Sequence, residues 1–277
     1  MRDGSVPHDG HRDIPTVVGN LHVRIVGAGP VAVLWPSMFA DSAMWDRIIP
    51  ALSAERRLVL IDGPSHGWSD ALDGRSSMPE CVSAAVEILT ALDVTDPVDW
   101  VGCAWGGHVG LHLAAGRPGR LRTLVTFSSP IQPLSRALRL QVIALKPLVR
   151  IIGMRGPVRS GIVDGQLTEA SRVDAEVMGV VDAMLDALPR AGLIHAVDSF
   201  ILDRTDIGDL LPRIDVPVLY VASTDRGECT PEQAAAAAAR TPHGSSLGVD
   251  GARTLVPLEQ PGATSETILG FWAAHPA

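Results

Sequence analysis

Short apolar runs alternate with helix-like stretches along most of the chain. Runs typical of strands occupy residues 21–26, 31–35, 58–61, 98–101, 121–127, 216–222 and 246–249. Helical spacing of apolar residues occurs between or after these runs, at residues 44–52, 79–92, 106–115, 231–240 and 264–274. Such alternation is the signature of successive βαβ units, so it predicts an α/β fold built on a mostly parallel sheet.

The alternation stops between residues 130 and 209, where only helical spacing is found. Leu138, Val142 and Leu145 lie at helical spacing, and a break rich in Gly and Pro follows at residues 153–157. We therefore predict a core domain made of residues 1–129 and 210–277, with a helical cap inserted at residues 130–209.

Charge and hydropathy exclude several classes of partner. The chain has 277 residues and a formal net charge of −8, and no basic stripe is present to displace counterions from nucleic-acid phosphates. No apolar run approaches the roughly 20 residues of a membrane-spanning helix. The longest candidates are broken by Lys146, Pro147 and Arg150. We therefore expect no nucleic-acid partner and no membrane partner.

Cysteine usage and the start of the chain indicate a reducing compartment. Cys81, Cys103 and Cys229 lack C-x-x-C spacing, which argues against both a zinc site and a disulfide framework. Residues 1–13 are polar and charged, unlike a signal peptide. We therefore expect a cytoplasmic protein with no metal and no organic cofactor.

Three motifs in a fixed order indicate the fold. Residues 101–107, V-G-C-A-W-G-G, place small residues two before and two after Ala104, as the strained turn of a nucleophile elbow requires. The stretch D-G-P-S-H-G-W-S-D occupies residues 62–70, and L-E-Q-P occupies residues 258–261. Together they resemble the α/β-hydrolase superfamily, in particular its cap-bearing esterases, lactonases, dehalogenases and epoxide hydrolases. The resemblance covers nearly the whole chain and implies an eight-stranded, mostly parallel sheet with flanking helices.

The resemblance also assigns positions to the catalytic groups. At the family's nucleophile position this chain has Ala104, which offers no attacking atom. At the family's base position it has Thr254, which offers no imidazole. Its acid position matches Asp225. The backbone N–H groups of Met38 and Trp105 match the oxyanion donors, which do not depend on side-chain identity. A serine esterase is disfavoured, because losing a triad serine or histidine typically costs about a million-fold in turnover.

Five further residues are candidates for the pocket. Cys103 precedes the elbow tip and His108 follows it by one helical turn, so each is a possible substitute for the lost groups. A small buried thiol and a packed helix histidine are the plainer interpretations. Trp35, Ser37 and Ser128 follow strand ends, where ligands bind in open α/β sheets.

Three functional hypotheses remain open. The first, which we favour, is a non-serine enzyme: a lyase, isomerase or cyclase, or a hydrolase working by general acid–base catalysis, on a small, largely apolar organic substrate. The second is a catalytically inactive pseudo-hydrolase that binds a ligand. The third is an unconventional hydrolase using Cys103 or His108. In each case the partner is a small molecule, and the chain is a monomer or a homodimer.

Overall fold

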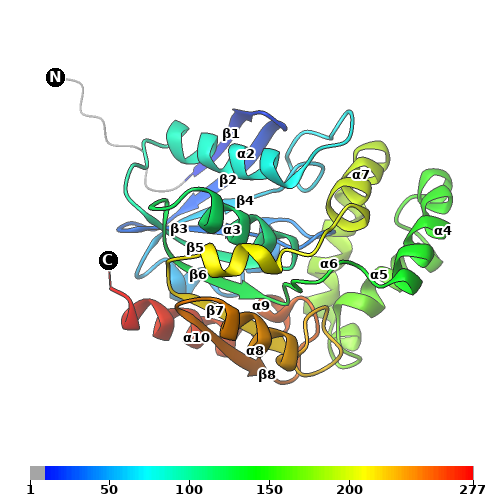
Figure 1. The fold of residues 1–277 in the computed structure, drawn as a ribbon. Coiled ribbons are helices and arrows are strands. Elements are labelled where there is room, and N and C mark those ends of the chain that lie inside the picture. The colour runs from blue at the N-terminus through cyan, green and yellow to red at the C-terminus, as the bar shows by residue number, and fades with distance from the viewer. Residues whose placement is uncertain (1–9, 277) are drawn as a thin grey trace.

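The computed structural model describes residues 10–276, which form one sheet with helices around it (Figure 1). The strands lie in the order β1-β2-β4-β3-β5-β6-β7-β8. Their bounds are β1 Gly10–Thr16, β2 Gly19–Val26, β3 Val31–Trp35, β4 Arg57–Ile61, β5 Val98–Cys103, β6 Leu121–Phe127, β7 Val218–Ser223 and β8 Gly244–Val249. The predicted fold class is confirmed: an eight-stranded, mostly parallel sheet with flanking helices.

Pairing directions bring the loops of interest to one edge of the sheet. β1 pairs with β2, and β2 with β4, in antiparallel register, whereas every pair from β4 to β8 is parallel. All residues of β5 and β7 are buried, as expected for parallel strands covered on both faces. Strand order reverses between β3 and β5. In open sheets of this kind, ligands bind beyond the carboxyl ends of the strands at such a reversal.

The helices of the core connect the strands and cover the sheet. α3 packs against β5 and β6, and α8 packs against β7 and β8. Ser77 caps α2 by accepting the Glu80 N–H, and Thr230 and Gln233 form a capping box on α8. The bounds are α1 Ile49–Leu52, α2 Met78–Ala91, α3 Trp105–Gly116, α8 Pro231–Arg240, α9 Val256–Glu259 and α10 Pro261–Ala274.

Only helices and connecting loops lie between β6 and β7, in the segment predicted as a cap. They are α4 Arg136–Ile152, α5 Pro157–Gln166, α6 Ala175–Ala187 and α7 Arg190–Ala196, with a π-helical turn at Val197–Leu202 and 3₁₀ turns at Ser171–Val173 and Gly208–Arg213. α4 lies at the outer edge of the molecule, far from the sheet (Figure 1). Between residues 10 and 276, no helix is both long and apolar enough to cross a membrane.

Two elements differ from the pattern-based prediction. β1 was not predicted, because Ile14 is its only buried residue and its strand conformation depends on backbone pairing with β2. The helix predicted at residues 44–52 is reduced to a 3₁₀ turn, Ser42–Trp45, and the single turn of α1. Pro50 lacks the N–H that a continuous helix would need there. Of the polar start of the chain, residues 1–9 lie outside the described residues.

Candidate active site

The chain retains the backbone of a nucleophile elbow between β5 and α3. Ala104 has φ 44° and ψ −103°, a conformation that non-glycine residues rarely adopt. Gly102 lies against the backbone of Gly106, and Gly106 lies against the Trp35 carbonyl, so a Cβ at either glycine would clash with main-chain atoms. Such strain persists only where the surrounding structure over-determines it. The tip of this turn carries the methyl group of Ala104.

The end of β6 holds the elbow in place. The Ala104 N–H donates to the Phe127 carbonyl at 2.7 Å, and the Ser129 hydroxyl donates to the Ala104 carbonyl at 3.0 Å. A Cβ at Gly107 would collide with that same hydroxyl group. Ser129 therefore stabilises the conformation of the elbow.

The two predicted oxyanion donors remain unpaired. Within residues 10–276, neither the Met38 N–H nor the Trp105 N–H donates a hydrogen bond. The Met38 carbonyl accepts a 2.7 Å hydrogen bond from Gln166 Nε2, which comes from the end of α5 in the cap. Unpaired buried N–H groups are rare in folded proteins, so these two donors are available to an acceptor atom of a ligand.

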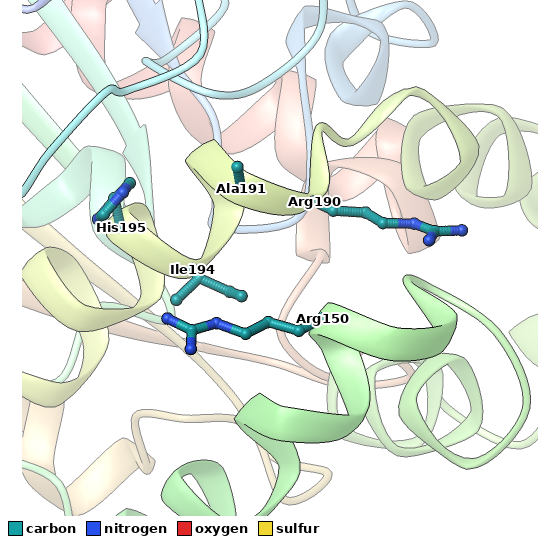
Figure 2. A pocket seen from close by; sticks show the side chains of 5 residues that line it. All are labelled: Arg150, Arg190, Ala191, Ile194 and His195. Atoms are coloured by element: carbon teal, nitrogen blue, oxygen red, sulfur yellow. The ribbon is translucent and has the colours of Figure 1, made fainter.

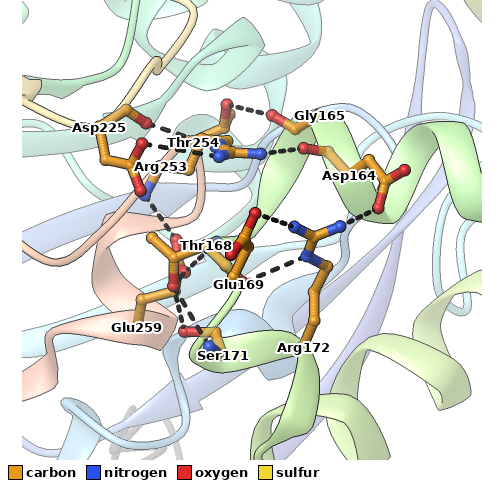
Figure 3. A network of polar contacts seen from close by, with 10 residues as sticks. All are labelled: Asp164, Gly165, Thr168, Glu169, Ser171, Arg172, Asp225, Arg253, Thr254 and Glu259. Carbon is orange, nitrogen blue, oxygen red and sulfur yellow. Dashed lines mark hydrogen bonds and ion pairs between the residues drawn. The ribbon is translucent and has the colours of Figure 1, made fainter.

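Thr254, at the predicted base position, is held by the segment at the end of α5. The Thr254 side chain is fully buried, and its hydroxyl donates to the Gly165 carbonyl at 3.2 Å (Figure 3). Its N–H donates to the Gln166 carbonyl at 3.0 Å. A buried neighbour, Glu259, accepts from the Thr168 N–H and hydroxyl through Oε1 and from the Arg253 N–H through Oε2. The segment after α5 is thereby fastened over the site.

Asp225 lies in the loop after β7, beside Arg253 rather than at the elbow. One Oδ1···Nη2 distance is 3.6 Å, and the Asp225 carbonyl accepts from Arg253 Nε at 3.4 Å (Figure 3). Its side chain is 44% exposed. In the part of the chain that the structure describes, no contact joins its carboxylate to Thr254 or Ala104. Asp225 therefore contacts Arg253, the residue before Thr254 in sequence. The side chains at the acid and base positions are not paired with each other.

Cys103 is poorly suited to act as a nucleophile. Its side chain is fully buried, and Sγ donates to the Thr254 carbonyl at 3.3 Å. Burial and the nearby carboxylates Glu228 and Glu259 raise the pKa of the thiol far above its ordinary value. Because the thiolate is the reactive form, this environment argues against a catalytic thiol.

Two buried histidines lie near the elbow, and both are neutral at ordinary pH. His66 Nδ1 bonds to the Pro64 carbonyl at 2.9 Å, and Nε2 accepts the Phe39 N–H at 3.0 Å, so both ring nitrogens are engaged. Burial lowers the pKa of His66 to about 4. His108 Nε2 donates to the Pro130 carbonyl at 2.7 Å, and burial lowers its pKa to about 3.

Aromatic side chains pack against one another beside the elbow. The Trp105 ring stacks on Phe200 at 4.5 Å between centroids and meets Trp35 edge-on at 5.7 Å. The indole N–H groups of Trp35 and Trp105 are buried without partners. Nine of the predicted pocket residues are buried, with a relative exposure of at most 6%: Trp35, Ser37, Met38, Cys103, Ala104, Trp105, His108, Ser128 and Thr254. Asp225 is the exception, with a side chain that is 44% exposed. The assignment of these residues to one pocket stays a prediction.

Phe200 also lines a cavity of about 270 Å³, which we call the cavity behind Phe200. His108 is the only predicted pocket residue among those that line it. The lining is mixed rather than largely apolar, and consists of Ser76, Ser77, Met78, Pro79, His108, His112, Pro130, Ser199, Phe200, Asp203, Arg204, Thr205 and Ile207. Phe200 belongs to the π-helical turn, a feature frequent at functional sites. Sequence reasoning missed Phe200, Arg204 and Gln166, because the cap carries no motif that would identify them.

A second cavity, of about 300 Å³, lies between α4 and α7 and is lined by Arg150, Arg190, Ala191, Ile194 and His195 (Figure 2). Within residues 10–276, no group of three or more His, Cys, Asp or Glu side chains is arranged to hold a metal ion.

Comparison with known proteins places the chain in a family. The profile of the alpha/beta hydrolase family matches residues 32–267, and the chain belongs to this family. A pimeloyl-[acyl-carrier protein] methyl ester esterase from Neisseria meningitidis is 30% identical over 186 residues, covering 66% of this chain and 70% of that protein. The enzyme of the same name from Xanthomonas campestris is 25% identical over 261 residues, covering 92% of this chain and 100% of its own.

Solved structures show the same fold at low sequence identity. A thermophilic esterase from Thermogutta terrifontis has a TM-score of 0.87 and 23% identity, covering 96% of this chain and 100% of its own. An enol-lactonase from Burkholderia xenovorans has a TM-score of 0.84 and 21% identity, covering 95% of this chain and 100% of its own.

Proposed function

We propose that this chain is a non-hydrolytic member of the alpha/beta hydrolase family that binds a small organic molecule and forms no acyl-enzyme. The observation that carries the proposal is the elbow itself. Its strained turn is intact, but its tip is Ala104, which is 3% exposed and is followed directly by Trp105, whose ring stacks on Phe200. A methyl group offers no atom that can attack a carbonyl carbon.

The base position supports the same conclusion. Thr254 is held by cap carbonyls, and both nitrogens of His66 are engaged in hydrogen bonds. The curated relatives carry the name of a methyl ester esterase of an acyl-carrier protein. Hydrolysis of an ester by these enzymes needs an activated nucleophile. We expect this chain not to catalyse that reaction, because it has neither a nucleophile at Ala104 nor a base at Thr254.

The cavity behind Phe200 suits the ligand. Its volume of about 270 Å³ is near the lower end for small-molecule sites. Hydroxyl, imidazole and guanidinium groups line it together with Met78 and Ile207, which favours a compact molecule with polar groups on an apolar frame. Rotation of Phe200 away from Trp105 would extend this cavity toward the unpaired N–H groups of Met38 and Trp105, which would then donate to a carbonyl or carboxylate oxygen of the ligand.

The catalytic part of the proposal is tested with p-nitrophenyl esters and a fluorophosphonate probe. We expect the wild type to remain unlabelled and to turn over esters about a million-fold more slowly than a serine esterase. Ala104→Ser restores a hydroxyl but no base, so it should remain unlabelled too. Ester turnover at serine-esterase rates by the wild type would contradict the proposal.

The binding part is tested by a thermal-shift screen of small acids, esters and alcohols. We expect a hit whose stabilisation is lost in His112→Trp, because the larger side chain fills the cavity. His243→Trp is the matched control, since the His243 side chain is 59% exposed and lies outside the cavity lining. A panel without hits, or hits that tolerate His112→Trp, would count against this cavity as the binding site.

A second candidate function is a non-covalent enzyme that uses general acid–base chemistry, and one observation favours it. His108 lines the cavity, and within the described residues its Nδ1 forms no hydrogen bond, so a lone pair remains available there. Its pKa of about 3 makes it a weak base. Turnover of a bound ligand that disappears in His108→Gln but resists the fluorophosphonate probe would favour this candidate.

A further inference from the structure

Helix α4 is apolar on two opposite sides. Val142, Val149 and Ile152 are partly buried and pack against the core. On the opposite side, Leu140 is 66% exposed and Ile151 is 72% exposed. Residues at spacings of three and four share a helix face. The exposed face therefore forms a continuous apolar strip, which we call the outer strip: Leu140, Ile143, Ala144, Pro147 and Ile151.

The charge of α4 is opposite to that of the whole chain. The helix carries Arg136, Arg139, Lys146 and Arg150 and no acidic residue, whereas the chain has a formal net charge of −8. Arg139 bonds to the Leu202 carbonyl and Lys146 bonds to Asp198. Within residues 10–276, Arg136 and Arg150 form neither an ion pair nor a hydrogen bond. These two cations flank the outer strip and have no protein anion to neutralise them.

Other arginines of the cap are paired differently. Arg159 contacts Asp182 and Asp186, and Arg172 contacts Asp164 and Glu169. Arg136 and Arg150 of α4 differ from these arginines, because neither has a carboxylate partner among the described residues.

The cavity between α4 and α7 adds to this positive region. The Arg150 side chain extends below Ile194, while Arg190 and His195 lie on the facing helix α7 (Figure 2). Arg190 donates only to the Ile151 carbonyl, at 3.4 Å, and has no carboxylate partner among the described residues. The C-terminal half of α4 therefore borders a hollow of about 300 Å³ with cations on both sides.

We propose that the outer strip of α4 binds the surface of an anionic lipid bilayer, with the helix lying in the plane of the interface. A helix that presents Leu and Ile on one face, flanked by Arg, is the usual form of an interfacial membrane contact. Leu140 and Ile151 would enter the headgroup region, and Arg136 and Arg150 would meet lipid phosphates. This surface contact departs from the expectation of no membrane partner, although it requires no membrane-spanning segment.

Charge argues for this occupant over a second copy of the chain. A two-fold pairing of α4 helices would bring the unpaired arginines of one copy toward those of the other, which is unfavourable. The net negative charge of the chain opposes the bilayer at long range. At physiological salt the Debye length is about 8 Å, so the charges of α4, at the outer edge of the molecule, dominate once it approaches.

The proposal is tested by flotation of the full-length protein with vesicles. One set contains phosphatidylcholine alone, and the other contains phosphatidylcholine with about a third phosphatidylglycerol. We expect binding to the anionic vesicles only. Arg136→Gln and Arg150→Gln should each weaken it about fivefold, since a basic residue near such a surface is worth about 1 kcal/mol. Leu140→Ser combined with Ile151→Ser should weaken it at least about tenfold.

Matched controls come from other surfaces of the molecule. Val173→Ser removes an apolar side chain that is 86% exposed, and Arg117→Gln removes an exposed cation, so both should bind as the wild type does. The proposal is overturned by absent binding, by equal binding to neutral vesicles, or by equal losses in the controls. A dimer that the strip variants dissociate, or an acidic protein bound in place of vesicles, would also overturn it. The outer strip lies outside the elbow and the cavity behind Phe200, so these outcomes leave the proposed function untouched.

Discussion

The elbow leaves no room for a methyl group at Gly106, because its Cα faces the main chain at Trp35 and Pro36. We expect Gly106→Ala to lower the free energy of unfolding by at least about 1–3 kcal/mol, the usual cost of overpacking. Gly179→Ala is the matched control. Gly179 lies on the exposed side of α6 with no atom near its missing Cβ, so alanine there should add about 0.5–1 kcal/mol. Urea unfolding of both variants measures the difference, and a tolerated Gly106→Ala would mean that the elbow is looser than these contacts indicate.

At this same scale, the sequence predicts positions better than environments. The spacing of Gly102, Ala104 and Gly106 reflects a requirement of the backbone, so it can be recognised from the sequence alone. The ring of Phe200, which stacks on Trp105, comes from a segment almost a hundred residues away in sequence. No local pattern encodes such a contact, so the packing of Phe200 against the elbow could not be predicted from the sequence.

Glu259 links two segments of the chain: the cap segment after α5 and the loop before α9. It is 8% exposed and accepts three hydrogen bonds, two from Thr168 at 2.8 and 2.9 Å and one from Arg253 at 2.7 Å. Hydrogen bonds to a charged group contribute about 1.5–3 kcal/mol each, with incomplete additivity. We expect Glu259→Ala to cost about 3 kcal/mol or more and to speed proteolysis within residues 130–209.

Glu266→Ala is the control for this clamp, because Glu266 is solvent-exposed on α10, away from the cap, and its side chain forms no hydrogen bond or ion pair within residues 10–276. Its unfolding free energy and proteolysis pattern should match those of the wild type. If Glu259→Ala left cap proteolysis unchanged, the fastening of the cap would have to come from Gln166 and Thr254 instead.

Helices and strands could be predicted from the sequence where their buried residues form a recognisable apolar pattern. The strands β3 to β7 are buried on both faces and read as continuous apolar runs. β1 buries only Ile14 and was missed, since an edge strand held by backbone hydrogen bonds needs no apolar pattern. The outer strip of α4 shows the converse. Its apolar spacing predicts a helix correctly but gives no indication of which side faces the protein.

For the whole molecule, the balance of buried ionisable groups sets the pH dependence of stability. In the folded chain the pKa of His66 is lowered to about 4 and that of His108 to about 3, both mainly by burial, from an ordinary value of 6.5. Below pH 6.5 the unfolded chain therefore binds protons that these folded histidines refuse, and stability falls as the pH falls. Asp41 acts oppositely. Burial and the nearby Asp62 raise its pKa from 3.8 to about 6, so its protonation favours the folded state between those values.

Two histidines outweigh one aspartate, so these three groups together should lower stability by about 1.4 kcal/mol for each pH unit between pH 6 and pH 4. Urea unfolding at several pH values measures this slope. In His108→Gln one titrating group is lost, so the slope should be smaller than that of the wild type by about 1.4 kcal/mol for each pH unit. His243→Gln should retain the wild-type slope, because the His243 side chain is 59% exposed. Equal slopes in all three proteins would show that the buried histidines do not control the acid sensitivity of the fold. A slope that is smaller only in His108→Gln would attribute this sensitivity to the ring that lines the cavity.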